Sequence, residues 1–169
     1  MSILALDLAT NTGWAWGNLE DGPEYGSVRL PSTDRDIGRF GLAFKNWLEA
    51  KLDATQPSLI AVEEPIFPSK NTQIMTLRKL YVLAGIVEMV AVERKIKIFE
   101  ETIGTIRVGF LGHNKVNKQM KPYPITFACQ ERGWDPKTTD EADALALWVH
   151  AYRVWEPERS LKLDPLFMG

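Results

Sequence analysis

The N-terminal stretch Ile3–Leu8 (ILALDL) constrains the fold most, because it places one carboxylate, Asp7, inside an otherwise apolar run. Nearly unbroken apolar runs of this length are typical of strands that are buried on both faces of a sheet. An unpaired charge in such a strand costs several kcal/mol or forces the group to protonate. The sequence therefore predicts a core strand in which the Asp7 side chain has either a charged partner or a functional role.

Composition places the chain among ordinary soluble globular proteins. Of its 169 residues, 45% are hydrophobic and 25% are charged, which fits one domain with a substantial core. The apolar stretches are too short to span a bilayer, and the N-terminus lacks the pattern of a signal peptide. A single cysteine, Cys129, fits a reducing compartment. We therefore expect a cytoplasmic protein that has no membrane partner.

Two further strands are expected soon after the first, at Gly13–Gly17 and Tyr25–Leu30, separated by the turn signal Glu20-Asp21-Gly22-Pro23. Three short strands joined by tight turns would form an antiparallel meander. The apolar runs Leu59–Val62 and Lys97–Phe99 each follow a stretch with helical spacing, as parallel strands do. The sequence therefore predicts a mixed α/β fold, in which helices cover both faces of a five-stranded sheet with three antiparallel strands and further parallel ones.

Helical spacing of apolar residues predicts the elements that connect and follow these strands. Ser32-Thr33-Asp34 offers an N-cap for the first helix. The expected helices cover residues 37–52, roughly 71–95, 102–110, 125–132 and 140–155. Since no repeat or linker interrupts the chain, residues 1–155 are expected to form one domain, and residues 156–169 a tail without a regular pattern.

A basic segment lies within a chain whose formal net charge is −2. In residues 107–137, six basic residues accompany two acidic ones. Such a segment indicates a possible phosphate-contacting surface, although a solvated loop has the same composition and is favoured on charge alone. The basic residues are Arg107, Lys115, Lys118, Lys121, Arg132 and Lys137.

Four carboxylates lie at positions that are unusual for acidic residues in segments that form a hydrophobic core. Asp7 lies in the first strand, and Glu63 ends the apolar run LIAVE. Asp140 and Asp143 open the last helix, where a spacing of three puts both on one face. Each has an ordinary interpretation as a helix-capping acid or a surface charge. For all four acids together this ordinary interpretation is less convincing, because both Asp7 and Asp143 have apolar neighbours in the sequence.

Carboxylates that are forced together repel one another, and their pKa values rise unless a cation neutralises them. Hard oxygen ligands of this kind suit Mg²⁺ or Mn²⁺. Two such ions can hold the attacking and leaving oxygens of a phosphoryl displacement. The chain lacks the motifs of zinc and acyl-enzyme chemistry. We therefore expect Mg²⁺, or alternatively Mn²⁺, with two ions in each site.

These residues also resemble a known family. The matching features are Asp7 followed by Thr-x-x-Gly, Ala-Val-Glu ending at Glu63, and Asp-x-x-Asp-Ala-Leu-Ala from Asp140. The stretch Glu63–Asn71 is similar to a Glu-Gln-(apolar/aromatic)-x-Lys-Asn passage, with Glu64 at the position of the Gln. Over about residues 1–153 this pattern resembles RuvC, the Holliday junction resolvases of the ribonuclease H-like superfamily.

The resemblance implies a ribonuclease H-like fold and a homodimeric, Mg²⁺-dependent endonuclease. Such an enzyme cuts two strands of a four-way DNA junction and leaves 5′-phosphates. By the same resemblance, the catalytic residues are the four metal-binding acids Asp7, Glu63, Asp140 and Asp143, together with a lysine that stabilises phosphate charge. Lys118 is the best match for this lysine, and Lys115 and Lys121 are alternates.

The resemblance also implies which residues contact DNA and the second protomer. Phe67 occupies the place of an aromatic side chain that stacks on bases near the crossover. The other expected DNA-binding residues are Lys70, Asn71, Lys115 and Lys121. The helix starting near Asn71 would form the dimer interface, with Met75, Leu80, Ile86 and Met89 as candidate packing residues.

Three departures from the family pattern leave room for a different activity. Glu64 stands where the family has Gln, the sequence pI is about 5.8, and residues 154–169 match nothing in the family. A nuclease that debranches several DNA structures, such as a phage-type member, therefore fits as well. An RNA-processing nuclease of the same superfamily and a non-catalytic DNA-binding relative also stay open at the level of the sequence.

An actin-like kinase or ATPase fits the sequence less well. Asp7–Gly13 also resembles the phosphate loop of those enzymes. That loop needs a glycine where this chain has Ala9, because its backbone must approach phosphate closely. The actin-like fold also repeats its core over two domains, which 169 residues do not hold. We therefore expect no nucleotide cofactor.

Overall fold

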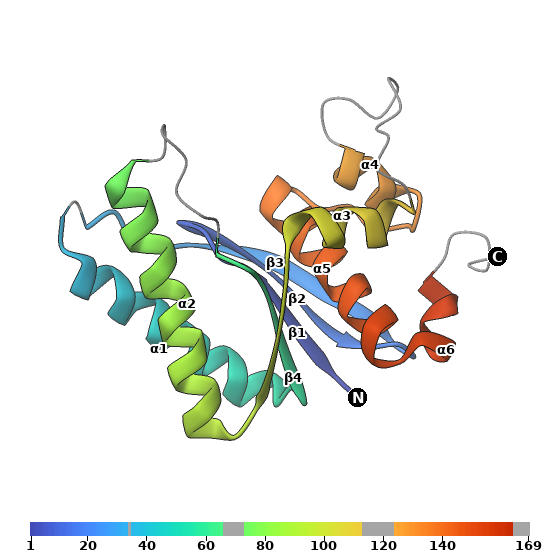
Figure 1. The fold of residues 1–169 in the computed structure, drawn as a ribbon, viewed down its shortest axis with the longest axis horizontal. Coiled ribbons are helices and arrows are strands. Elements are labelled where there is room, and N and C mark those ends of the chain that lie inside the picture. The colour runs from blue at the N-terminus through green and yellow to red at the C-terminus, as the bar shows by residue number, and fades with distance from the viewer. Residues whose placement is uncertain (34, 66–72, 113–123, 164–169) are drawn as a thin grey trace.

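A five-stranded mixed sheet forms the centre of the computed structural model, which describes residues 1–33, 35–65, 73–112 and 124–163 (Figure 1). The strand order is β3-β2-β1-β4-β5. The strands are β1 (Ile3–Asp7), β2 (Asn11–Asn18), β3 (Gly22–Arg29), β4 (Leu59–Glu63) and β5 (Lys97–Glu101). The strands β1, β2 and β3 are antiparallel, whereas β4 runs parallel to both β1 and β5. The mixed α/β sheet predicted from the sequence is therefore confirmed.

Helices cover both faces of this sheet, as Figure 1 shows. One face carries α1 (Ile37–Thr55) and α2 (Ile74–Arg94). The other carries α5 (Thr139–Trp155), with α3 (Ile103–Leu111) and α4 (Pro124–Gln130) packed on it. The short helix α6 (Pro157–Ser160) and a 3₁₀ turn (Leu161–Leu163) follow α5. Among these described helices, none is both long and apolar enough to cross a membrane.

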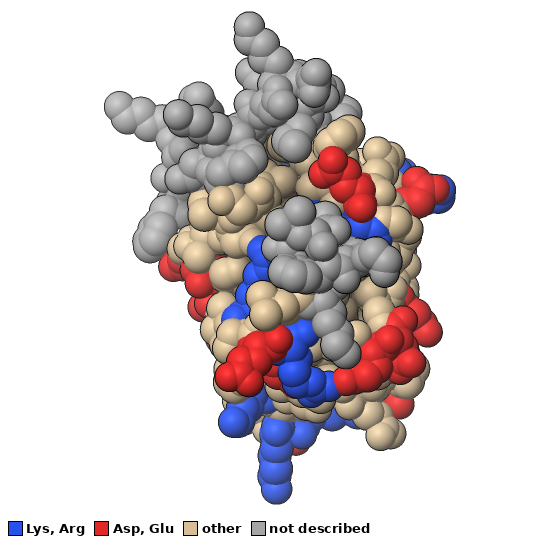
Figure 2. All heavy atoms as spheres, turned by 90° about the vertical axis from the view of Figure 1, so that its right-hand side faces the viewer, with Lys and Arg blue, Asp and Glu red and all other residues tan. Residues whose placement is uncertain are grey.

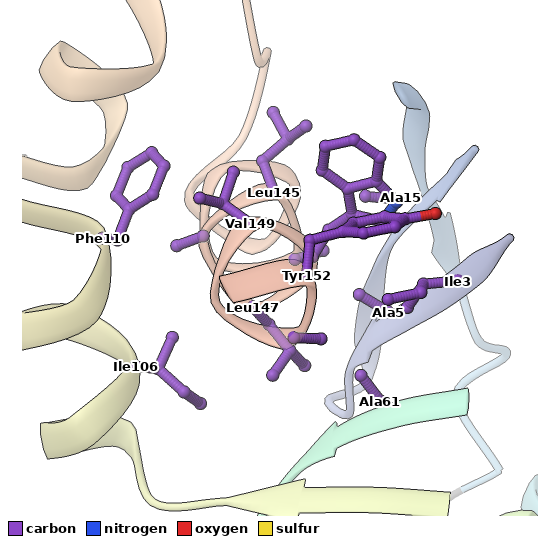
Figure 3. Packing of buried hydrophobic residues seen from close by; sticks show 14 of the residues in the cluster. Ile3, Ala5, Ala15, Ala61, Ile106, Phe110, Leu145, Leu147, Val149 and Tyr152 are labelled. Carbon is purple, nitrogen blue, oxygen red and sulfur yellow. The ribbon is translucent and has the colours of Figure 1, made fainter. Parts of the chain in front are cut away.

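The alternation of side chains along β1 decides which way Asp7 faces. Ile3 and Ala5 belong to the core on the α5 side, which Figure 3 shows, whereas Leu4 and Leu6 belong to the core under α1 and α2. Since successive side chains of a strand point to opposite faces, Asp7 continues the row of Ile3 and Ala5. The carboxylate therefore faces α5.

The start of α5 lies directly against β2 at Gly13. A Cβ atom at this position would be 2.0 Å from the backbone oxygen of Asp140. Any side chain at residue 13 would therefore push the first turn of α5 away from the sheet. Gly13 is also the register partner of Asp7 on β1 and of Ser27 on β3.

Two local expectations from the sequence are wrong. The first helix is capped by Asp36, whose side-chain oxygen accepts a hydrogen bond from the Arg39 backbone N–H at 2.9 Å, and not by Ser32-Thr33-Asp34. The tail expected to lack a regular pattern contains α6 and the 3₁₀ turn. Pro157 at the first turn of α6 explains this helix, because its fixed φ suits a helix start.

Arg132 anchors this C-terminal segment and is not part of a phosphate-contacting surface. Its side chain is buried, and its guanidinium donates hydrogen bonds to the backbone oxygens of Ala128 (2.8 Å), Phe110 (3.1 Å) and Leu163 (3.2 Å). It also lies over the Phe110 ring. Arg132 therefore ties together α3, α4 and the turn after α6. Its inclusion in the basic segment as a candidate phosphate contact is wrong for that reason.

Arg132→Ala should lower the free energy of unfolding by about 3 kcal/mol, because three buried carbonyls lose a charged donor. Urea unfolding followed by circular dichroism measures this change. Arg159→Ala is the matched control, since Arg159 makes exposed ion pairs with Glu20 and Glu156 that are worth roughly 0–1 kcal/mol. Equal, small losses in both variants would contradict the anchoring role of Arg132.

Candidate active site

Two of the four candidate acids end neighbouring parallel strands. Asp7 is the last residue of β1 and Glu63 the last of β4, one position beyond the register pair Leu6↔Val62. Like Asp7, Glu63 faces α5, because Ala61 two residues earlier belongs to the core on that side. The carboxyl ends of the two strands therefore bring two carboxylates to one edge of the sheet.

The other two acids come from the start of α5, which local hydrogen bonds define. The Thr138 hydroxyl accepts a hydrogen bond from the Glu141 backbone N–H at 3.2 Å. The Glu141 carboxylate in return accepts one from the Lys137 backbone N–H at 2.7 Å. This reciprocal capping fixes the first turn of the helix. It sets Asp140 and Asp143 on the helix end that lies against β2 near Gly13.

The electrostatics of these acids show that their charges act on one another. Burial, together with nearby carboxylates, raises the pKa of Asp7 to about 8. The carboxylates responsible are those of Asp143, Glu63 and Asp140, in decreasing order of effect. Burial and the charge of Asp143 raise the pKa of Glu63 to about 7. The structure therefore brings together the four acids that the sequence singled out.

Among the described residues, Arg107 on α3 is the cation whose charge acts on this cluster. Its positive charge lowers the pKa values of Asp7, Glu63 and Asp143, opposing the effect of burial, which raises all three. The Arg107 side chain is also exposed, so it is open to a ligand. The sequence interpretation counted Arg107 only within the basic segment. What brings it to the acids is the packing of α3 against α5, which no local motif signals.

The two other described basic residues of that segment do not serve the site. Arg132 is buried and donates hydrogen bonds to backbone oxygens, and Lys137 forms an ion pair with Asp135. On the face of the molecule that carries α3, α4 and α6, Lys and Arg side chains lie between Asp and Glu side chains (Figure 2). In the part of the segment that the structure describes, Arg107 is therefore the basic residue directed at the acids.

Two residues of the β2–β3 hairpin contact the start of α5, and the sequence interpretation missed both. Asn11 donates a hydrogen bond from Nδ2 to Oδ2 of Asp140 at 2.5 Å. Ser27 donates one from its hydroxyl to Oε1 of Glu141 at 2.9 Å. These pairs are 129 and 114 residues apart in the chain, so a single sequence carries no signal for them.

A cavity of about 100 Å³ adjoins Asp7 and Glu63. It is also lined by Leu8, Glu64, Pro65, Leu80 and Ala84. Glu64 is exposed, and its backbone N–H donates a hydrogen bond to the Glu101 backbone oxygen at 2.9 Å. The residue that departs from the family pattern therefore lies beside the acids.

The donor chemistry of the cluster fits a hard divalent cation. All four side chains offer carboxylate oxygens, and burial and mutual repulsion raise the pKa values of Asp7 and Glu63, which a bound cation would oppose. Within the described ranges, however, no group of three or more His, Cys, Asp or Glu residues is arranged so that it could hold a metal ion. The acids therefore share an electrostatic environment without forming a coordination shell.

Several predicted functional residues lie outside the described residues. These are Phe67, Lys70, Asn71, Lys115, Lys118 and Lys121. The helix expected from near Asn71 is described from Ile74 onward, as α2. The assignments of Lys118 to catalysis and of the other five to DNA binding remain predictions.

Without divalent cations, the free energy of unfolding should fall as the pH rises from about 4 to about 8. The folded protein keeps the Asp7 proton up to a pKa of about 8, whereas the unfolded chain loses it near 3.8. Rising pH therefore favours the unfolded state in this range, and Glu63 adds to the effect up to about 7. Urea unfolding in a chelating buffer at several pH values measures the slope. Asp7→Asn should flatten it, and an unchanged slope would contradict the burial of Asp7.

Comparison with known proteins connects this arrangement to solved structures. No family profile and no curated protein matches the sequence. RuvC from Thermus thermophilus, in complex with a Holliday junction substrate, matches with a TM-score of 0.73 at 18% identity, over 94% of this chain and 97% of that one. The yeast mitochondrial Holliday junction resolvase Ydc2 matches with a TM-score of 0.60 at 10% identity, over 95% of this chain and 82% of that one.

A third structure extends the likeness to a viral enzyme. The fowlpox virus resolvase, in complex with Holliday junction DNA, matches with a TM-score of 0.51 at 9% identity, over 90% of this chain and 99% of that one. Identities this low establish the fold alone. The ribonuclease H-like sheet predicted from the sequence is thus confirmed, and this chain has the fold of the RuvC-like Holliday junction resolvases.

Proposed function

We propose that this chain is a divalent-metal-dependent endonuclease that resolves four-way DNA junctions and leaves 5′-phosphates. The observation that carries the proposal is the convergence of Asp7, Glu63, Asp140 and Asp143 at the ends of β1 and β4 and the start of α5. The fold shared with RuvC, whose structure is solved with a Holliday junction substrate, supports the choice of DNA as the substrate.

Asp7, Glu63, Asp140 and Asp143 would hold Mg²⁺, or Mn²⁺ in its place, with two ions in each site. Bound there, the ions would supply an activated water and stabilise the leaving oxygen of the phosphodiester. Asp7 contributes a ligand whose position is set by a core strand that cannot move independently of the sheet. Glu63 contributes the equivalent ligand from the neighbouring strand.

Arg107 would contact the scissile phosphate. It is exposed, and its charge already acts on three of the four acids, so a phosphate approaching them also approaches the guanidinium. A guanidinium can donate two parallel hydrogen bonds to phosphate oxygens. Lys118 remains the proposed catalytic lysine. Phe67, Lys70, Asn71, Lys115 and Lys121 remain the proposed contacts to the branched DNA.

A nuclease that accepts several branched DNA structures is the second candidate, and Glu64 favours it. This exposed carboxylate lines the same cavity as Asp7 and Glu63, so it would add negative charge at the rim of the site, where a phosphate backbone would approach. Such repulsion would weaken the contacts that make a resolvase strict for one junction geometry. The range of substrates cleaved decides between the two candidates.

A homodimer through α2 is part of the proposal. Ile74, Tyr81, Met89 and Val92 form an exposed apolar row along this helix, and Val92 and Ile74 are 78% and 74% exposed. Their spacing places them on one face of the helix. Of the packing residues expected from the sequence, Met89 belongs to this row. Leu80 lines the cavity beside Asp7, and Ile86 packs into the core under α1 and α2.

Asp7→Asn should lower the rate of Mg²⁺-dependent cleavage by more than about 100-fold, because it removes a metal ligand. Binding of the DNA should persist, since the variant keeps every phosphate contact. Gel assays with labelled four-way, three-way, flap and duplex DNA measure cleavage, and mobility shifts in EDTA measure binding. Unchanged cleavage of the four-way junction by this variant would contradict the assignment of Asp7 as a metal ligand. Equal cleavage of all branched substrates by the wild type would favour the second candidate.

Val92→Asp should convert a dimer into a monomer, because it places a charge in the apolar face that two copies would bury. Sedimentation equilibrium across a range of concentrations measures the change. Val154→Asp is the matched control, since Val154 is 50% exposed on α5, on the opposite face of the sheet. A wild-type protein that stays monomeric, or an equal effect of both variants, would argue against the α2 interface.

A further inference from the structure

A neutral side chain holds one of the four acids in place. The Nδ2 group of Asn11 donates to Oδ2 of Asp140 at 2.5 Å, and both residues are partly buried. In this pair the amide nitrogen of Asn11 is the donor and the carboxylate oxygen of Asp140 is the acceptor. Asn11 keeps this donor at every pH and brings no positive charge that would compete with a bound cation.

The backbone around Asn11 is itself fixed by hydrogen bonds. Asn11 is the first residue of β2 and is paired with Arg29 on β3. In the turn that leads into β2, the Thr12 hydroxyl donates to the Ala9 backbone oxygen at 2.7 Å. The Leu30 backbone N–H donates to the Thr10 backbone oxygen at 2.8 Å. Asn11 therefore presents its amide from a rigid position on the sheet.

The helix turn that carries Asp140 is fixed from the same hairpin. Gly13 lies two residues after Asn11, on the same face of β2, and contacts the backbone of Asp140. The neighbouring Glu141 is buried, and both of its oxygens accept hydrogen bonds, one from Ser27 and one from the Lys137 backbone N–H. Glu141 thereby fixes the helix start, whereas Asn11 acts on the Asp140 carboxylate itself.

We propose that Asn11 is a positioning residue for the metal site, which orients the Asp140 carboxylate by holding its Oδ2 while the hairpin fixes the backbone of the same residue. The proposal rests on the proposed function, because it assigns Asp140 as a metal ligand. It predicts that Asn11 contributes to the affinity for the cation without touching the cation itself.

Asn11→Ala should weaken Mn²⁺ binding by about 10- to 100-fold, the usual effect of losing a residue that orients a metal ligand. Isothermal titration calorimetry with Mn²⁺ alone measures the affinity, and urea unfolding in EDTA measures stability. Asn11→Leu is a second variant that keeps the branched shape of the side chain but has no hydrogen-bond donor. In single-turnover cleavage of a four-way junction, both variants should need more Mn²⁺ than the wild type and should approach its rate at saturation.

Asn18→Ala is the matched control. Asn18 lies at the other end of β2 and makes the same kind of bond, from its Nδ2 to Oδ2 of Asp21 at 2.8 Å. It also accepts hydrogen bonds from the Glu20 and Asp21 backbone N–H groups, so its loss should destabilise the hairpin. The variant should nevertheless bind Mn²⁺ with wild-type affinity, which separates a positioning role from a purely structural one.

Four further outcomes would overturn one or both proposals, and they separate the inference from the proposed function. Wild-type affinity for Mn²⁺ in both Asn11 variants would overturn the positioning role alone. An equal loss of affinity in Asn18→Ala would reduce Asn11 to a residue that merely stabilises the hairpin. A wild-type protein that binds no Mn²⁺ would overturn both proposals. A wild-type protein that binds Mn²⁺ but cleaves no junction would overturn the proposed function and leave the role of Asn11 standing.

Discussion

The contact between Gly13 and the first turn of α5 is the constraint on which the candidate site depends. Because residue 13 has no side chain, the backbone of Asp140 lies directly against β2. Gly13 is also the register partner of Asp7 on the adjacent strand. The same close approach therefore sets the height of the helix above the sheet and the separation between the acids of α5 and Asp7. A bulkier residue here would separate the two halves of the site without altering any of the four acids.

The carboxylate of Asp7 is costly to ionise in this structure, because burial and its acidic neighbours all disfavour the charged form. Burial and three neighbouring acids raise the pKa of Asp7, while Arg107 acts in the opposite direction. The core strand that carries Asp7 prevents the carboxylate from moving away to water. Under the proposed function, a cation would relieve this repulsion, so metal binding and folding stability would be coupled. In a site of this kind the metal ligands are already positioned before the metal binds, and the metal-free protein is less stable as a result.

Sequence reasoning succeeded where the signal was local. The apolar run Ile3–Leu8 predicted the core strand that carries Asp7, and the spacing of Asp140 and Asp143 predicted that both lie on one face of the last helix. It failed where the outcome depended on packing between distant segments. Nothing near Arg107 in the chain marks it as the cation of the site, and the partners of Asn11 and Ser27 are more than a hundred residues away. Counting charges also misassigned Arg132, because composition does not distinguish a basic surface residue from a buried donor to backbone carbonyls.

The turn after Asp7 differs from a phosphate loop in its residues and its hydrogen bonds. A loop that cradles phosphate presents successive backbone N–H groups to the ligand and needs glycine for close approach. Here Ala9 takes the place of that glycine, and its backbone oxygen accepts a hydrogen bond from the Thr12 hydroxyl. The chain therefore reverses at once into β2 and directs Asn11 and Gly13 toward α5. Asn11 and Gly13, which follow Ala9 within four residues, thus bring the hairpin to the start of α5, where two of the four acids lie.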